Sequence, residues 1–308
     1  MKLATIELDG HQTPALLLED GRLCNLHALA QAAGPASLPF PWTGRGELTM
    51  ADLAAGGAET WAWCRDIAAK GGANLVPPGS YRLAAPVPRP PKNIFCLGRN
   101  YIEHVQEDNV SRNLQTQVPE HPQFFTKPWT SIVPHEAPIR YDQRVTRRLD
   151  YEVELAVIIG KGGRDIPADD AYAHVFGYSI LNDVSARDLQ KRHDQWFKGK
   201  ALDGNCPFGP WIVAPDEIGD PHALAISLTV NGEPRQNAST GDMIFTIPRI
   251  IESLSAGLTL EPGDVIATGT PSGVGYAMNP RQWLKDGDLV ECTIEKIGTL
   301  SNRVMEVR

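Results

Sequence analysis

The chain has 308 residues, of which 42% are hydrophobic and 21% charged, a composition typical of a soluble globular protein with one large domain or two unequal ones. Its 29 Lys and Arg against 37 Asp and Glu leave a net charge of −8. This balance argues against a nucleic-acid or anionic-membrane binder, which would need a basic face. No run approaches the ~20 apolar residues that span a bilayer. Five scattered cysteines without a CxxC pair indicate reduced thiols and a cytoplasmic location.

The first 76 residues predict a small α/β module. Two or three short strands are expected before residue 26, around turns at Gly10 and Gly21, and short helices are expected over residues 26–33, 48–56 and 59–70. Residues 77–91, PPGSYRLAAPVPRPP, contain six prolines and predict an extended linker. We therefore expect a boundary before a larger domain over residues 92–308.

Strand patterns dominate the larger domain. Runs rich in β-branched and aromatic residues predict strands over 93–98, 151–160, 176–183, 211–214, 224–232, 264–269 and 289–298. The Asn231–Gly232 step predicts a hairpin turn. Helices are expected over 168–175 and 246–257. The fold class is therefore expected to be α+β and mainly β.

Two acids begin a buried strand in LDYEVELAVIIGK. Side chains alternate along a strand, so Glu152 and Glu154 project from one face. Asp183 ends another apolar strand, FGYSILND. Three carboxylates without a neighbouring Cys or His pair favour a hard cation such as Mg²⁺, Mn²⁺ or Ca²⁺. The alternative is a solvated strand face with Asp183 in a surface turn.

A histidine and a glutamate stand three residues apart in GRNYIEHVQE. On a helix His104 and Glu107 would be neighbours, and the carboxylate would orient the imidazole as a base. The alternative is a surface pair. The polar segment that follows, residues 108–123, predicts a lid over the site or an ordinary surface loop.

Two further segments contain polar groups that could act in a binding site. Residues 185–211 are rich in cations and end in a Pro-bracketed turn, which favours Lys200 as the cation held in place. The loop ATGTPSGVG, residues 267–275, is not a nucleotide-binding motif, but its backbone N–H groups could bind a substrate carboxylate.

Together and in this order, these motifs closely resemble the fumarylacetoacetate hydrolase family, in particular its bacterial C–C-bond hydrolases and decarboxylases with a small N-terminal extension. The resemblance runs from about Pro91 to the C-terminus and rests on GRNYIEHVQE, FFTKPWTS, LDYEVELAVIIGKGGRDI, FGYSILNDVSARDLQ, KGKALDGNCPFGPWIV, TLEPGDVIATGTPSGVG and LKDGDLVECTIEKIGTLSNRV. It implies a mixed β-roll or sandwich core in a homodimer.

The resemblance also implies roles for individual residues. Glu152, Glu154 and Asp183 would bind the divalent metal, with Mg²⁺ expected. His104 and Glu107 would activate water, and Lys200 would stabilise an enolate. The implied substrate-binding residues are Arg99, Lys127, Arg187, Gln190 and Thr270.

These roles predict a metal-dependent hydrolase that cleaves a C–C bond in a β-diketo or acylpyruvate-type acid, a small anionic oxo-acid. The alternative is decarboxylation or tautomerisation of a 2-oxo diacid such as oxaloacetate, which uses the same metal-held enolate. A third hypothesis, from another class, is a silent metal-binding or scaffolding protein.

Overall fold

The computed structural model describes residues 1–112 and 118–307 of the chain. Part of the predicted lid, residues 113–117, lies outside the described residues. No helix in the described ranges is long and apolar enough to cross a membrane.

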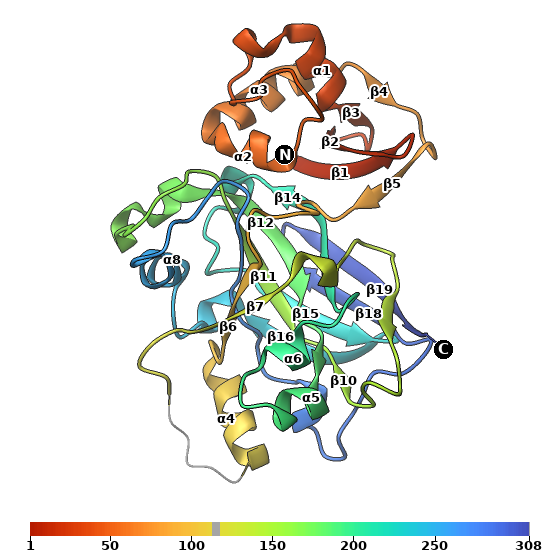
Figure 1. Ribbon diagram of the computed structural model, residues 1–308, viewed down its shortest axis with the longest axis vertical. Coiled ribbons are helices and arrows are strands. Elements are labelled where there is room, and N and C mark those ends of the chain that lie inside the picture. The colour runs from red at the N-terminus through yellow and green to blue at the C-terminus, as the bar shows by residue number, and fades with distance from the viewer. Residues whose placement is uncertain (113–117, 308) are drawn as a thin grey trace.

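The N-terminal region contains three helices where the sequence predicts them, next to a small group of strands (Figure 1). Helix α1 begins where the Asn25 side chain accepts a hydrogen bond from the Ala28 N–H, and α2 begins at a capping box formed by Thr49 and Asp52. The elements are β1 (Lys2–Leu8), β2 (His11–Leu17), β3 (Leu23–Asn25), α1 (Leu26–Ala33), η1 (Pro35–Ser37), α2 (Met50–Ala55), α3 (Gly57–Ala69) and β4 (Leu75–Val76).

The N-terminal strands continue into the main sheet of the body. Strand β1 pairs antiparallel with β14 (Cys206–Val213), with Lys2 opposite Val213. The predicted linker includes β5 (Tyr81–Ala84), which pairs with β1. The main path of this sheet runs β4-β3-β2-β1-β14-β12-β11-β17-β6-β7. Its other members are β6 (Ile94–Gly98), β7 (Gln123–Lys127), β8 (Ile132–Val133), β11 (Val153–Ile159), β12 (Val175–Asn182) and β17 (Val265–Ala267).

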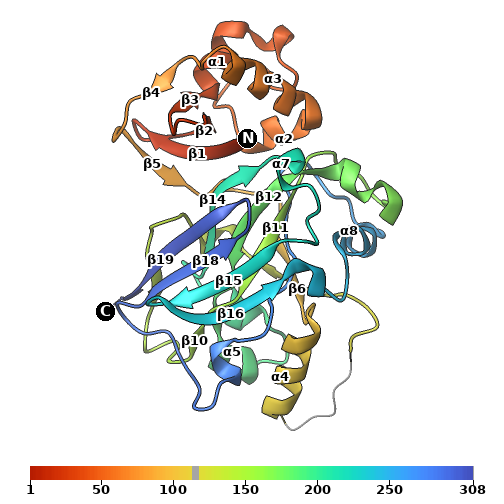
Figure 2. The ribbon, with the colours of Figure 1, turned by 180° about the vertical axis from the view of Figure 1, so that it is seen from behind.

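A second sheet packs against the first, and Figure 2 shows it in front of β11 and β12. Its order is β16 (Glu233–Ser239), β15 (Ala225–Val230), β18 (Leu289–Ile294), β19 (Gly298–Glu306) and β9 (Ile139–Tyr141). The predicted hairpin joins β15 to β16, because Asn231 and Gly232 both adopt the positive φ that this turn requires. A separate two-stranded ladder pairs β10 (Leu149–Asp150) with β13 (Ser185–Ala186).

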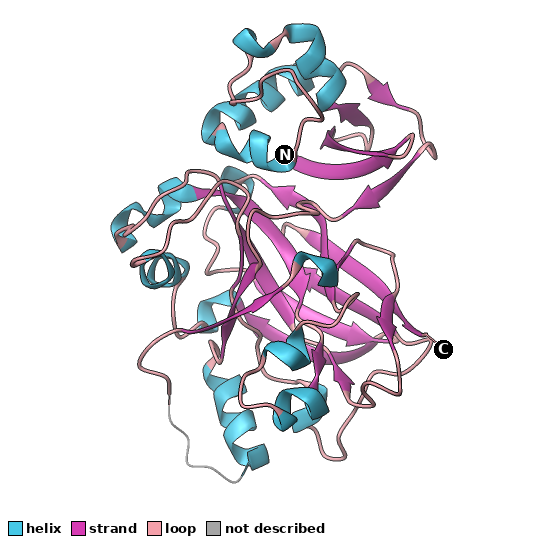
Figure 3. Cartoon of the chain, viewed as in Figure 1, coloured by secondary structure: helices cyan, strands magenta, loops and turns pink. Residues whose placement is uncertain are grey.

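Short helices surround the sheets of the body (Figure 3). The expected helix over 246–257 is α8, with Thr246 as its N-cap, whereas the expected helix over 168–175 is the 3₁₀ helix η3. The remaining elements include α4, which carries the predicted dyad. The bounds are α4 (Ile102–Arg112), η2 (Trp129–Ser131), η3 (Ala168–His174), α5 (Arg187–Arg192), α6 (Phe197–Lys200), α7 (Pro215–Ile218), η4 (Thr240–Asp242), α8 (Ile247–Ser255) and η5 (Gly275–Ala277).

Strand β11 lies at the centre of the molecule and is buried on both faces. Val153, Leu155 and their alternate neighbours pack against the second sheet, whereas Ala156 and Ile158 belong to the core shared with the N-terminal helices. The continuous apolar run predicted this two-sided burial. The fold is α+β and mainly β, as expected from the sequence, and the N-terminal region lies at the opposite end from α4 and α5 (Figures 1 and 2).

Candidate active site

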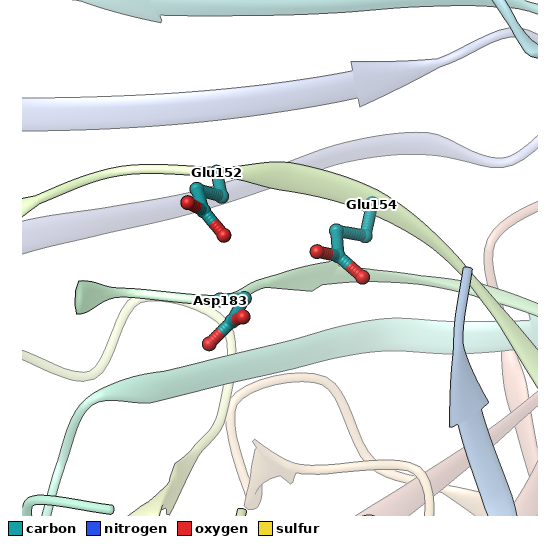
Figure 4. Close-up of side chains that lie close together, drawn as sticks. All are labelled: Glu152, Glu154 and Asp183. Carbon is teal, nitrogen blue, oxygen red and sulfur yellow. The ribbon is translucent and has the colours of Figure 1, made fainter. Parts of the chain in front are cut away.

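Three acids meet where β11 and β12 lie side by side. Glu152 and Glu154 project from the same side of the strand toward the segment that carries Asp183 (Figure 4). The Asp183 N–H donates to the Glu152 carbonyl at 2.8 Å, which fixes the two backbones against each other. One oxygen from each carboxylate lies within 4.8 Å of the others, and all three side chains are buried. The structure therefore excludes the alternative in which these acids lie on a solvent-exposed strand face and in a surface turn.

The acids have unequal surroundings. Lys200 Nζ lies 2.7 Å from both Glu152 Oε2 and Asp183 Oδ2, and Arg187 lies 2.7 Å from Glu152 Oε1. Burial alone would raise the pKa of Glu152, but these two cations lower it below its ordinary value. Glu154 accepts a hydrogen bond from the Gly269 N–H at 2.8 Å. Burial, and then the nearby Asp183 and Glu152, raise the pKa of Glu154 well above its ordinary value.

This donor set fits a divalent cation. The described Lys and Arg residues place no ion pair on Glu154, and the three acids crowd like charges in a buried space. Carboxylate oxygens are the ligands that Mg²⁺, Mn²⁺ and Ca²⁺ prefer, and a bound cation would relieve the repulsion. Glu152, Glu154 and Asp183 are therefore the residues that would hold a metal ion.

The predicted dyad forms on α4. His104 Nδ1 lies 2.8 Å from Glu107 Oε1, and the histidine is only 8% exposed. The helix follows the buried Asn100, whose side chain donates to the carbonyls of Phe245 and Thr268 and so anchors the turn before it. The second Glu107 oxygen accepts a hydrogen bond from the Gly273 N–H at 2.9 Å. Both carboxylate oxygens of Glu107 are therefore held in place, and this carboxylate in turn fixes the orientation of the His104 imidazole.

Eight of the eleven predicted site residues line one small cavity of about 40 Å³. They are Arg99, His104, Glu152, Glu154, Arg187, Gln190, Lys200 and Thr270. Asp183 and Glu107 contact members of this group without lining the cavity. Of the N-terminal residues 1–76, none lines it.

Lys127 takes a different place from the expected one. It does not line the cavity but lies fully buried behind Asp183, with Nζ 2.8 Å from Asp183 Oδ1. The ammonium also donates to the carbonyls of Val184 and Lys200, at 3.0 and 2.5 Å. Because all its donors point to the protein, Lys127 positions Asp183 and the Lys200 backbone and does not reach a substrate.

The Gly-rich loop also differs from expectation. The N–H groups of its three glycines donate to carboxylates of the protein and are unavailable to a substrate, and the Thr268 N–H donates to the Leu155 carbonyl. Gly269 donates to Glu154, Gly273 to Glu107, and Gly275 and Tyr276 to Asp150. The loop connects the metal-binding acids to the dyad.

Asp150 is the main site residue that the sequence analysis missed. It is fully buried, and its Oδ2 accepts from Arg187 Nε at 2.8 Å while Oδ1 accepts from the Gly275 N–H at 2.8 Å. Burial raises the pKa of Asp150, and Arg187 opposes this shift. The same two-residue period that links Glu152 to Glu154 extends back to Asp150 and could have identified it.

Aromatic side chains complete the cavity wall and were also missed. Phe125 and Trp196 pack edge to face with ring centroids 5.6 Å apart, and both line the cavity. Lys200 Nζ lies 5.1 Å from the centre of the Phe125 ring. Gly98 provides the space for Trp196, because a Cβ there would lie 2.3 Å from the indole.

A model of the fumarylacetoacetate (FAA) hydrolase C-terminal domain matches residues 93–305. The chain belongs to the fumarylacetoacetate hydrolase family. Among curated members of the family, oxaloacetate tautomerase YisK of Bacillus subtilis is 51% identical over 223 residues, covering 72% of this chain and 73% of that protein. Human mitochondrial oxaloacetate tautomerase FAHD2A is 44% identical over 234 residues, covering 75% and 72%.

Solved structures of the family share the whole fold. The fumarylacetoacetate hydrolase from the psychrophile Exiguobacterium antarcticum matches with a TM-score of 0.78 and 38% identity over the full length of both chains. The N-terminal region is therefore included in the match. The relatives make this chain a member of an enzyme family, and their names include both tautomerases and hydrolases.

Proposed function

We propose that this protein is a divalent-metal-dependent tautomerase of oxaloacetate or a closely related 2-oxo diacid, with Mg²⁺ as the metal. The observation that carries the proposal is a buried acid triad and a Glu-oriented histidine around one small cavity. This arrangement suits removal of a proton next to a carbonyl. The similarity to YisK favours tautomerisation over the acylpyruvate hydrolysis that we expected first from the sequence.

The chemistry divides between the metal and the side chains. A divalent ion on the triad would stabilise negative charge on the oxygens of a 2-oxo acid. His104, oriented by Glu107, takes the proton from C3 of the keto form and returns a proton in the reverse direction. Lys200 supplies a positive charge at the cavity wall where the enolate oxygen develops. No water has to attack in this reaction.

Hydrolysis of a β-diketo acid is the second candidate, and the hydrolase from Exiguobacterium antarcticum supports it. In that reaction His104 would deprotonate a water, which attacks the carbonyl before the C–C bond breaks. Decarboxylation of oxaloacetate would use the same enolate and release CO₂. The three reactions would use the same side chains of the protein and would give different products.

The test follows the enol absorbance of oxaloacetate in the ultraviolet, with Mg²⁺ and with EDTA, while pyruvate and CO₂ are measured in parallel. We expect metal-dependent relaxation between enol and keto forms without either product. Stoichiometric pyruvate would identify a decarboxylase. Incorporation of ¹⁸O from water into the products of an acylpyruvate, without tautomerase activity, would identify a hydrolase.

A further inference from the structure

A second and larger pocket adjoins the reaction cavity. Its volume is about 530 Å³, against about 40 Å³ for the reaction cavity. Four side chains line both spaces and form their common wall, namely Arg187, Gln190, Trp196 and Tyr276. The inner cavity has room only for the chelating end of a substrate. Because the two spaces share these four residues, the outer pocket is the adjoining space into which the remainder of a longer substrate would extend.

The outer pocket is lined by cations that the protein does not neutralise. Arg148, Lys191 and Arg281 line it, and within the described ranges none of these side chains forms a hydrogen bond or ion pair. His193 also lines the pocket, and Asp194 is the one acid among the lining residues. Some exposed arginines elsewhere have partners, as in the Arg65–Asp216 pair at 2.8 Å. On a chain of net charge −8, this local excess of positive charge favours an anionic ligand.

Segments far apart in the sequence bring these cations together. Arg148 precedes β10, Lys191 lies on α5, and Arg281 lies in the connection between η5 and β18. Figures 1 and 2 both show the blue turn of η5 beside α5. Arg148 and Lys191 also line an adjoining surface hollow, so the positive field extends outward from the site.

Aromatic walls add a surface for a carbon chain. Trp283 lines the outer pocket, and Trp196 and Tyr276 stand at the common wall. The Arg187 guanidinium lies 4.8 Å from the centre of the Tyr276 ring, which holds this part of the wall in place. Flat apolar sides combined with unpaired cations fit a methylene chain that ends in a carboxylate.

We propose that the outer pocket is a second carboxylate-binding subsite, which admits 2-oxo diacids longer than oxaloacetate and binds their remote carboxylate. Arg281, Arg148 and Lys191 determine this specificity. The inference rests on the proposed function only in placing the 2-oxo acid end of the substrate at the metal-binding acids.

The test uses two six-carbon 2-oxo acids that differ only at the remote end. 2-Oxoadipate carries a terminal carboxylate and 2-oxohexanoate a methyl group. Isothermal calorimetry on the Mg²⁺-loaded full chain measures the affinity of each. We expect the diacid to bind about tenfold more tightly, with a preference that shrinks as salt screens the charges.

Variants of the three cations show which of them provides the preference for the diacid. Arg281→Ala should reduce the preference for the diacid about three- to fivefold, since an exposed charge pair contributes modestly. The affinity for 2-oxohexanoate should not change. The matched control is Arg45→Ala, the same change of charge at an exposed residue in the N-terminal region. Arg148→Ala and Lys191→Ala repeat the test at the two other cations.

Equal affinity of the wild-type protein for the two acids would overturn the subsite, as would an undiminished preference in all three variants. A separate assay of oxaloacetate turnover tests the proposed function. A diacid preference without tautomerase activity supports the subsite and contradicts the proposed function. Turnover of oxaloacetate with equal affinity for both acids contradicts the subsite alone.

Discussion

At the scale of single residues, the site is governed by how each acid is compensated. Glu152 is neutralised by Lys200 and Arg187, whereas Glu154 receives only a backbone N–H from Gly269 among its hydrogen bonds. Identical side chains two residues apart therefore have opposite pKa shifts. Burial raises the free energy of each ionised carboxylate, and the neighbouring cations offset this for Glu152 but not for Glu154. Glu154 is therefore the acid that most needs a metal ion.

His104→Ala should lower kcat by roughly 10²–10⁴-fold, because a positioned base supplies about that factor. Metal binding should persist, since His104 is not among the three acids. Steady-state kinetics and calorimetric metal titration check the two parts. Gln106→Ala, at an exposed position of the same helix, is the control. Retention of full activity by the His104 variant would rule out the assigned base.

Asp150→Asn should damage both stability and activity. Each oxygen of Asp150 accepts from two N–H donors, so the amide nitrogen of Asn would face a donor in either orientation. Removal of one partner from a buried pair costs about 3–5 kcal/mol. Denaturant unfolding should show this loss, and KM should rise as Arg187 loses its anchor.

The control for Asp150 is Asp216→Asn, which breaks the exposed pair with Arg65. Exposed pairs contribute little to stability, so this variant should unfold like the parent protein. If Asp150→Asn matches the control in unfolding and in KM, Asp150 has no positioning role.

At the scale of elements, the loop after β17 organises the site. Its N–H groups bind acids from three separate places: Glu154 on β11, Glu107 on α4 and Asp150 on β10. Gly273 allows this close approach. Its φ is +101°, and a Cβ would lie 2.0 Å from the Arg235 carbonyl oxygen.

Gly273→Ala should therefore shift the loop and break its bond to Glu107. A displacement of about 1 Å at a catalytic group can cost on the order of 10²-fold in rate. Gly287→Ala is matched for backbone strain, because Gly287 has a φ of +85° and a Cβ there would meet no atom within 4 Å. Both variants should lose some stability, but only Gly273→Ala should lose kcat. Equal kinetics in the two variants would show that the loop does not position the dyad.

At the scale of the whole molecule, the N-terminal region is joined to the catalytic body through a shared sheet and core. Trp61 stacks on Phe176 with centroids 4.9 Å apart, and its indole N–H donates to the Phe176 carbonyl at 2.8 Å. The region is far from α4 and α5, so we propose a stabilising role for it (Figure 1).

Trp61→Ala should lower the free energy of unfolding by about 3–5 kcal/mol, as expected for a buried aromatic residue. Below the melting temperature, kcat should change little. Trp129→Ala, at a 43% exposed tryptophan, should cost less than about 1 kcal/mol. A loss of kcat in the folded Trp61 variant would connect the N-terminal region to catalysis. The expected homodimer remains a prediction, which light scattering would check.

The sequence predicted the mainly β fold from local patterns, and it predicted the acid triad and the His104–Glu107 pair from local spacing together with the resemblance to the family. Alternation along a strand puts Glu152 and Glu154 on one face, and the helical period puts His104 beside Glu107. The apolar run after the acids indicated that the strand is buried.

The tertiary structure alone decided the destinations of Lys127, the Gly-rich loop and the outer cations. Lys127 and Asp183 are 56 positions apart, and Arg148 and Arg281 are 133 apart. Their proximity depends on sheet order and on where the loop after β17 folds back, which no local period encodes. A side chain's partner is set by the packing of distant segments, and that packing determines whether a cation binds the protein or a ligand.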